Sequence, residues 1–470
     1  MNWIRLVMLV ILASLVLFFS PGGFFVTFVT LFIWLRLKKT TSPDNNFILN
    51  LFLIAFMTRL FLLLVFSAIL VSRNQILAYS NYPGWTPNLI GDASYYTLRS
   101  YWIALGWGGY PLSDKILNSA HYPMYGWNGY TYVIAVFHYV FGFSPIASIT
   151  INCLLGSLNA ILAYFIMKSL FTKKVAQLAG IFVGFYPSMI LWSVTNLKDT
   201  ALTFATLFII WSFIVFIHSQ GFKKVLSLIL IICGLLIQNT LRIGIMPITL
   251  ISLSVSYFLN IKSRSAKIKL FFTLIVCFVV FSFVGKLTME KINNKMHMAV
   301  YKLICFHQGG VTAPGSSYKI LEDKYYLLNS NYKPQRGDPD TEYYAYPIFK
   351  LSYFEYIPIY LRAMGHFMFE PFLWRIDTML KLFSLPQMII WYAMLPLALA
   401  GVFLSMRYAR RGSLILLVYF LLTSASLALT QSNIGTLFRM RDLITPIVLF
   451  WASVGMAKML GWKIKKEINA

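Results

Sequence analysis

Residues 145–168 read PIASITINCLLGSLNAILAYFIMK, an apolar stretch whose one charge, Lys168, comes at its end. A transmembrane helix needs about 20 predominantly apolar residues to cross the hydrocarbon core of a bilayer. Lys173 and Lys174 follow shortly after, as basic residues do on the cytoplasmic side of a span. This stretch therefore predicts a membrane helix that ends in the cytoplasm.

The composition of the whole chain is that of a membrane protein. Of its 470 residues, 59% are hydrophobic and only 12% are charged, whereas about a quarter of the residues of soluble domains are charged. The net charge of +25 would also suit nucleic acid, but many Lys and Arg residues lie in short clusters between apolar stretches, as topology signals do. We therefore expect membrane lipid, and no nucleic acid, as a partner.

The apolar stretches and their basic flanks predict an all-α, polytopic membrane protein with about twelve transmembrane helices, in a range of about 11 to 13. The predicted spans are 6–20, 22–37, 47–72, 145–168, 175–195, 200–218, 225–238, 243–260, 269–285, 386–404, 413–430 and 443–459.

A further apolar stretch, 129–142, is too short for a full crossing. A helix of this length extends about 20 Å, and the hydrocarbon core is about 30 Å thick. We interpret it as a re-entrant segment or one that lies at the membrane surface. Every basic cluster then falls on one side, which places both termini in the cytoplasm and the protein in the cell (plasma or inner) membrane.

The spans divide the chain into four parts. These are an N-terminal hairpin at 1–40, a transmembrane core at 41–285 that includes the first outer loop 73–127, an extracytoplasmic cap at 286–385 whose segment 354–383 resembles an interfacial helix, and C-terminal helices at 386–470. Of the fifteen carboxylates, only Asp44 and Glu467 fall on the predicted cytoplasmic side. Chemistry that needs carboxylates is therefore expected outside the cell.

The first outer loop contains the stretch NLIGDASYYTLRSY, residues 88–101. If a helix begins between Asn88 and Gly91, Asp92, Tyr95, Tyr96 and Arg99 share one face. An acid in the first turn is stabilised by the helix dipole, which favours an ionised carboxylate able to act as a base. Asp92 is thus the candidate catalytic residue. The alternative is that it only caps a surface helix.

A second acid, Asp199, follows Lys198 between two apolar stretches. Carboxylates from two loops can share a divalent ion such as Mg²⁺ or Mn²⁺ through oxygen ligands, so Asp92 and Asp199 are candidate metal ligands. No other cofactor is expected. The alternative is that the charge pair simply ends two membrane helices.

Several further side chains on the outer side are candidates for substrate binding. Guanidinium groups bind phosphate oxygens in a bidentate manner, which points to Arg242 and to the pair Arg439 and Arg441. Attachment to lipid headgroups is the alternative for these three. His121 lies among Tyr and Trp residues of the kind that stack on sugars, although a structural role explains it as well.

Three segments carry a family resemblance: GDASYY at 91–96, the stretch from YGWNGYTYVIAVF to FIMKSLFTKK at 125–174, and FYPSMILWSVTNLKDTALTF at 185–204. They resemble the GT-C superfamily of membrane glycosyltransferases, in particular the protein O-mannosyltransferase and aminoarabinose transferase branch. The resemblance covers about residues 45–220, with a weaker likeness at GTLFRMRDLITP, 435–446. The chain departs from the family by its N-terminal hairpin and by lacking a large soluble C-terminal domain.

The resemblance implies transfer of a sugar from a polyprenyl-phosphate donor, with a catalytic Asp in the first outer loop that Asp92 matches. Asp199 matches a second outer-loop acid of some members. We expect an inverting glycosyltransferase that acts on a glycan, lipid or protein hydroxyl. Candidate contacts to the substrate or its phosphate are Tyr95, Tyr96, His121, Lys198, Arg242, Arg439 and Arg441.

Two other functions fit part of the pattern. A polysaccharide polymerase or ligase would depend on outer arginines rather than on Asp92. A transporter or flippase of lipid-linked sugars would place ionisable groups inside the membrane, and there Arg59 is the conspicuous candidate. Arg59 either extends to the cytoplasmic surface or pairs with a neighbouring group.

Overall fold

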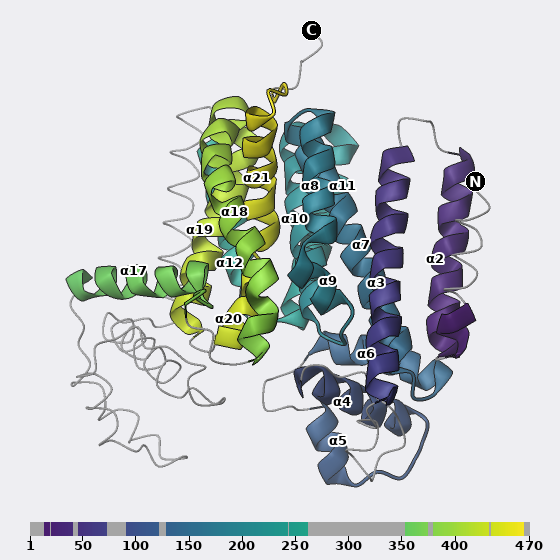
Figure 1. Cartoon of the computed structure of the whole chain (residues 1–470). Coiled ribbons are helices and arrows are strands. Elements are labelled where there is room, and N and C mark those ends of the chain that lie inside the picture. Colours follow the sequence, from purple (N-terminus) through teal and green to yellow (C-terminus); the bar gives the residue numbers. More distant parts are fainter. Residues whose placement is uncertain are drawn as a thin grey trace. The chain divides into compact units, whose positions relative to one another are not determined.

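The computed structural model of the chain describes residues 14–18, 20–40, 46–72, 91–121, 128–242, 244–261, 353–374, 379–431 and 434–464. Within these ranges every element of regular secondary structure is an α-helix, as predicted (Figure 1). Most of the predicted span 6–20, the span 269–285 and most of the cap 286–385 lie outside the described residues.

The described helices follow the predicted spans closely. In chain order they are α2 (Pro21–Thr40), α3 (Asn46–Ser72), α4 (Gly91–Trp107), α5 (Asp114–His121), α6 (Gly129–Phe141), α7 (Pro145–Leu170), α8 (Lys173–Phe185), α9 (Pro187–Ser193), α10 (Asp199–His218), α11 (Gly221–Leu241), α12 (Ile245–Asn260), α17 (Tyr353–Phe369), α18 (Met379–Tyr408), α19 (Arg410–Thr430), α20 (Ile434–Arg441) and α21 (Thr445–Met459).

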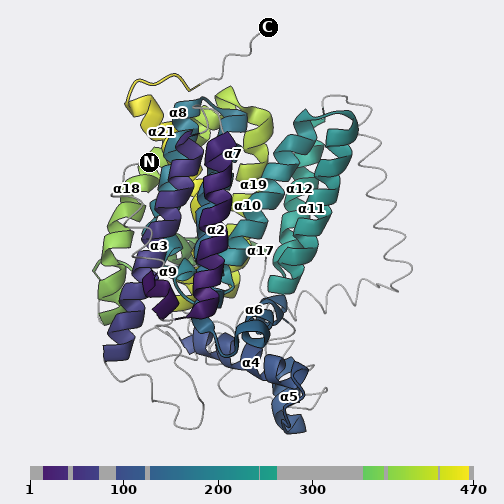
Figure 2. The ribbon, with the colours of Figure 1, turned by 90° about the vertical axis from the view of Figure 1, so that its right-hand side faces the viewer.

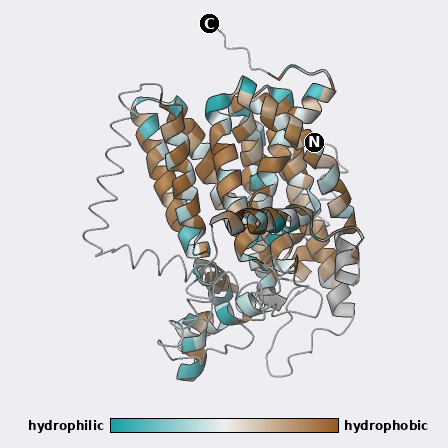
Figure 3. Cartoon of the chain, turned by 90° about the vertical axis from the view of Figure 1, so that its left-hand side faces the viewer, coloured by the Kyte–Doolittle hydropathy of each residue, from teal (hydrophilic) through white to brown (hydrophobic). Residues whose placement is uncertain are grey.

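The chain is a multi-pass membrane protein. Among the described residues, 7 helices are long and apolar enough to cross a membrane, or up to 9 if the bent pairs α8–α9 and α20–α21 each form one span. Apolar residues cover the long helices along most of their length (Figure 3). The predicted total of about twelve includes stretches that the structure does not describe, so this number stays a prediction.

Contacts divide the chain into two compact units. One comprises Met1–Leu250, Trp391–Ser413 and Pro446–Ala470, and the other comprises Ile251–Ile390 and Leu414–Thr445. In the first unit α7 is the central helix, because it packs against α2, α3, α8 and α10 (Figure 2).

The contact between α3 and α7 is an apolar core. Phe56 and Leu60 of α3 pack with Ile146, Ile149 and Cys153 of α7, and all five are buried. In a membrane the hydrophobic effect does not favour helix–helix contacts over helix–lipid contacts. Close packing between the two helices therefore stabilises the pair. This pair of helices forms the support for the polar groups described below.

The predicted span 175–195 is a broken helix. α8 ends at Phe185, α9 starts at Pro187, and the two axes differ by 52°. Proline lacks the N–H that would continue the hydrogen-bond ladder and its ring collides with the preceding turn. Tyr186 between them is extended, with φ −66° and ψ 129°. The break leaves carbonyl groups at the end of α8 that need other donors.

The first outer loop contributes α4 and α5, and both pack in one group with α6. The helix predicted within 88–101 is confirmed over the described residues, where α4 runs from Gly91 to Trp107. α6 has 13 residues, begins with Asn128 accepting a hydrogen bond from the Tyr130 amide, and ends at Gly142 with φ +72°. Its length agrees with a segment that does not cross the membrane.

The predicted interfacial segment 354–383 contains two helices rather than one. α17 ends at Phe369, just before Pro371, and α18 begins at Met379, before the predicted span 386–404. Proline disfavours a helical conformation of the residue that precedes it, which accounts for the end of α17.

Arg59 lies near the middle of α3 and is completely buried, with 0% of its surface exposed. Its guanidinium donates to the carbonyls of Ala55 and Gly184 and to the Ser193 hydroxyl. The alternative that its side chain extends to the cytoplasmic surface is therefore wrong, and pairing with neighbouring groups is confirmed.

Close approach of α18 and α21 generates a stability prediction. A Cβ added at Gly401 would overlap the backbone carbonyl of Trp451, and one at Gly455 would overlap that of Leu397. We expect Gly401→Ala and Gly455→Ala each to cost at least about 1–3 kcal/mol, since backbone cannot move aside as a side chain can. The measurement is thermal unfolding of the protein in detergent.

The matched control is Gly365→Ala. Gly365 lies in α17, and a Cβ added there would meet no heavy atom within 4 Å, so alanine is expected to leave the unfolding temperature unchanged or raise it slightly. Equal unfolding temperatures for all three variants would contradict the close approach of α18 and α21.

Candidate active site around helix α4

Asp92 is the second residue of α4, in the first turn of that helix. The position agrees with the predicted one, where the N-terminal end of the helix dipole favours an ionised carboxylate. The orientation of the Asp92 side chain lies outside what the structure describes. The surroundings of Asp92 are therefore defined by the residues that follow it along α4.

A chain of buried side chains ties α4 to the segment between α9 and α10. Asn196 donates through Nδ2 to Thr97 Oγ1 at 2.7 Å, and its Oδ1 accepts from the Tyr130 hydroxyl at 2.9 Å. Asn152 Nδ2 donates in turn to the Tyr130 hydroxyl oxygen at 2.7 Å. These four residues, from α4, α6, α7 and the 194–198 segment, are referred to below as the polar network.

Asn152 also holds the backbone of the 194–198 segment. Its Nδ2 lies 2.9 Å from the carbonyl oxygen of Thr195 and 2.8 Å from that of Leu197. Asn152 itself is completely buried in α7. Because a buried carbonyl without a donor is costly, this one amide group of α7 stabilises the path of the turn.

The same turn brings Lys198 to α4. Lys198 Nζ lies 5.7 Å from the centre of the Tyr96 ring, within the range of a cation–π contact. The Tyr96 ring meets the Tyr130 ring edge to face, with centroids 5.9 Å apart. Tyr96 is one turn after Asp92, so the structure brings Lys198 near the part of α4 that carries the candidate base.

Asp199, the first residue of α10, is also part of this region and is only 6% exposed. The pKa of the Tyr130 phenol is raised well above its usual value, mainly by burial, and the negative charge of Asp199 acts in the same direction. Tyr130 is therefore a neutral hydrogen-bond donor in the polar network. Lys198 thus lies beside α4, and Asp199 lies near Tyr130 of the polar network, while the roles predicted for both residues stay predictions.

Arg99 forms hydrogen bonds with the end of α5. Its Nε donates to the Ser119 carbonyl at 2.9 Å, and its Nη2 donates to the Ala120 carbonyl. Its Nη1 contacts the Tyr95 hydroxyl at 3.1 Å, and the guanidinium lies over the Tyr95 ring. Arg99 therefore binds the last carbonyls of α5, a stabilising position for a cation, and holds Tyr95 one turn earlier in α4.

His121 and Arg242 occupy the borders of the region. His121 closes α5, and its Nδ1 lies 2.9 Å from the hydroxyl of Tyr132 in α6. Arg242 follows α11, whose last turn packs through Thr240 against Gly129 at the start of α6. Substrate binding by His121 and phosphate binding by Arg242 stay predictions.

Arg439 and Arg441 lie in α20, in the second unit. Arg441 is only 3% exposed, and its guanidinium donates to the backbone carbonyl of Glu370 and contacts Met388 Sδ at 3.5 Å. Arg439 is half-buried. The phosphate-binding role predicted for both residues is not tested by these contacts.

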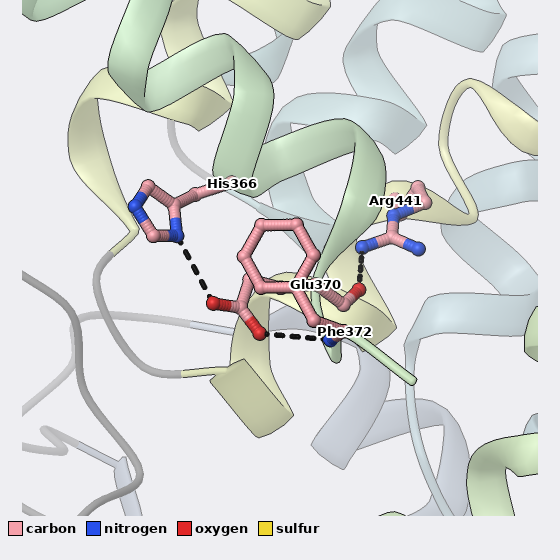
Figure 4. Close-up of polar contacts among 4 residues, drawn as sticks. All are labelled: His366, Glu370, Phe372 and Arg441. Carbon is pink, nitrogen blue, oxygen red and sulfur yellow. Dashed lines mark hydrogen bonds and ion pairs between the residues drawn. The ribbon is translucent and has the colours of Figure 1, made fainter. Parts of the chain in front are cut away.

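The Glu370 carboxylate forms a second buried cluster beside Arg441 (Figure 4). One oxygen lies 3.0 Å from His366 Nδ1, and the other accepts from the Phe372 amide at 3.2 Å. His366 lies in the last turn of α17 and Glu370 directly follows that helix, so their four-residue spacing indicates contact between the two side chains. The sequence interpretation had not singled out this pair.

The metal site predicted from Asp92 and Asp199 stays a prediction. Among the described residues there is no group of three or more His, Cys, Asp or Glu side chains that could hold an ion. A shared ion would therefore need further ligands from the donor phosphate, from water or from parts of the chain that the structure does not describe.

Residues 126–285 match the family model described as "Dolichyl-phosphate-mannose-protein mannosyltransferase". Over this segment, about a third of the chain, the match confirms the resemblance to the GT-C glycosyltransferases. It includes three members of the polar network together with Lys198 and Asp199, and it begins after Asp92. No curated protein matches the chain.

Among solved structures, the chain is similar to the archaeal oligosaccharyltransferase AglB from Archaeoglobus fulgidus in complex with an inhibitory peptide and a dolichol-phosphate. The likeness covers 90% of this chain and 51% of that one, with 13% sequence identity and a TM-score of 0.44. The chain thus spans about half the length of that protein. A likeness at this level does not assign a function.

The polar network generates the second prediction. Asn152→Leu keeps the approximate volume but removes the donor for Tyr130 and for two buried carbonyls. Each buried acceptor left without a donor costs about 1–3 kcal/mol, so the unfolding temperature in detergent should fall by several degrees. Thr150→Val is the matched control, because the Thr150 hydroxyl is equally buried in α7 but bonds only to Ile146 of its own helix. An Asn152→Leu protein as stable as this control would contradict the network.

Proposed function

We propose that the chain is a glycosyltransferase that moves a sugar from a polyprenyl-phosphate donor to a hydroxyl group on an extracytoplasmic glycan, lipid or protein. The observation that carries the proposal is the polar network, because it joins the helix of Asp92 to the turn of Lys198 and Asp199. The family match over 126–285 supports the same class of reaction. The charge pattern of the loops supports an extracytoplasmic site.

In this mechanism Asp92 is the general base. It accepts the proton of the acceptor hydroxyl while the hydroxyl oxygen attacks the anomeric carbon of the donor. The bond between that carbon and the phosphate oxygen breaks, its electrons leave with the lipid phosphate, and the configuration is inverted. Position in the first turn of α4 favours the ionised carboxylate that this step requires.

Lys198 stabilises the leaving phosphate. Its ammonium group is held over the Tyr96 ring, and a cation positioned in advance stabilises the negative charge that grows as the bond breaks. Arg242, at the end of α11, is a second candidate for this role. Tyr95 and Tyr96 provide aromatic faces for the transferred sugar.

The first test of the function is Asp92→Asn, which retains the size of the side chain and removes the base. General bases contribute about 10²–10⁴-fold to rate, so kcat for sugar transfer from a polyprenyl-phosphate sugar should fall by about that factor. The control is Asp114→Asn, which alters an exposed acid at the start of the neighbouring helix α5. Full transfer by the Asp92→Asn protein would overturn the assignment and favour a polymerase or ligase that relies on arginines.

The second test concerns the donor phosphate. Lys198→Met removes the charge and keeps the length of the side chain. Since hydrogen bonds to charged groups contribute about 1.5–3 kcal/mol, kcat/KM for the donor should fall about 10- to 100-fold, with the KM for the acceptor unchanged. Lys115→Met in α5 is the control, because Lys115 is an exposed lysine of the first outer loop. An unchanged kcat/KM for the donor would remove Lys198 from the phosphate site.

A further inference from the structure

Arg59 bridges the break between α8 and α9. Its Nη1 donates to the Gly184 carbonyl at 2.9 Å and to the Ala55 carbonyl at 3.0 Å, and its Nε donates to the Ser193 hydroxyl at 2.9 Å. Gly184 is the last residue but one of α8, and Ser193 is the last residue of α9. One side chain of α3 therefore contacts the broken helix both before and after its break.

The Gly184 carbonyl needs this donor because of the chain break. The last four carbonyls of a helix have no partner within it, and Pro187 together with the extended Tyr186 prevents the ladder from continuing. An unpaired carbonyl is expensive where no water is available. Arg59 supplies the donor from a neighbouring helix.

The surroundings of Arg59 are shaped to admit its guanidinium. A Cβ added at Gly156 of α7 would lie 2.7 Å from Arg59 Nε and 2.8 Å from the Ser193 Cβ. The Cys153 thiol donates to the Ser193 carbonyl at 3.4 Å. Ser193 is thus held through its hydroxyl by α3 and through its backbone by α7.

Stability alone does not account for a cation at this position. Arg59 is fully buried, its Nη2 has no hydrogen-bond partner among the described residues, and no carboxylate pairs with it there. A neutral donor could bond to the Gly184 carbonyl and the Ser193 hydroxyl without the cost of burying a charge. Ionisable residues retained inside membrane segments generally serve a function.

We propose that Arg59 is a positioning residue for the candidate active site: through Ser193 it fixes the start of the 194–198 segment. This segment carries Asn196 to Thr97 on α4 and presents Lys198 to Tyr96. Without Arg59, α9 loses its hydrogen bond to α3, and the turn that carries Lys198 and Asp199 can shift. Arg59 itself does not touch the substrate.

The test compares Arg59→Met with Ser193→Ala by hydrogen–deuterium exchange and mass spectrometry of the full chain in detergent. Met keeps an unbranched apolar side chain and removes all donors, whereas Ala removes only the hydroxyl that accepts from Nε. We expect exchange in peptides covering 187–199 to rise about tenfold in Arg59→Met and by a smaller factor in Ser193→Ala. Exchange in α2 and α11 should not change.

The control variant is Thr30→Val, because Thr30 is buried in α2 and its hydroxyl bonds only to Val26 of the same helix. It should leave exchange in 187–199 as in the unmodified protein. Unchanged exchange in Arg59→Met would overturn the proposal. A rise in exchange of equal size in all helices would also overturn it, since Arg59 would then contribute only to global stability.

A second readout links Arg59 to catalysis and rests on the proposed function. Arg59→Met should lower kcat/KM for a polyprenyl-phosphate sugar about tenfold or more, and Arg59→Lys should restore part of it, because an ammonium group can replace some of the donors. Hydrogen–deuterium exchange can be measured without enzymatic activity, so the proposed function and the positioning role of Arg59 can fail independently. If no variant and no unmodified protein transfers sugar, the proposed function fails while the exchange result still decides whether Arg59 positions the turn.

Discussion

The amide group of Asn152 is the interaction on which the arrangement of the candidate site depends. Its Nδ2 lies in the first half of α7, within hydrogen-bond distance of the Tyr130 hydroxyl and of the Thr195 and Leu197 carbonyls, which share its two N–H groups. Asn152 and the turn between α9 and α10 are buried, so a different path of this turn would leave buried carbonyls without a donor. Through Asn196 and Thr97 the path of the turn also sets where α4, the helix of Asp92, lies.

The broken helix α8–α9 leads directly into this turn. An unbroken helix over 175–195 would have satisfied its own backbone and needed no polar neighbours. The break at Pro187 instead creates unpaired groups, and Arg59 contacts the chain on both sides of it. Irregular backbone of this kind is found at membrane depth where protein or a cavity surrounds it. A buried cation and a buried amide therefore support the same turn from α3 and α7.

The sequence was sufficient to predict where most helices lie, because length, apolar content and basic flanks define a span without knowledge of its neighbours. α4 was also predictable, with Asp92 in its first turn. The partners of the side chains on α4 were not predictable, since Arg99 bonds to α5 and Tyr96 contacts Lys198. The position of α5 depends on its packing against α4 and α6, which the spacing of residues along α4 does not reveal.

The polar network was beyond sequence reasoning for a related reason. An asparagine in an apolar stretch has several possible partners, and Asn152 and Asn196 are 44 positions apart, on segments whose contact is set by helix packing. His366 and Glu370 are different, because their four-residue spacing at the end of α17 is visible in the sequence and indicates a contact. Arg59 was recognised as unusual, and only the break at Pro187 explains its partners.

The central claim is that α4 and the 194–199 turn form one site for a lipid phosphate. The direct measurement is photo-crosslinking of the purified protein with a polyprenyl phosphate that carries a photoreactive group next to the phosphate, followed by peptide mass spectrometry. The account predicts labelling within 91–107 and 194–199 that an excess of unmodified polyprenyl phosphate abolishes. Competed labelling that is confined to other segments, such as α17 or α20, would contradict it.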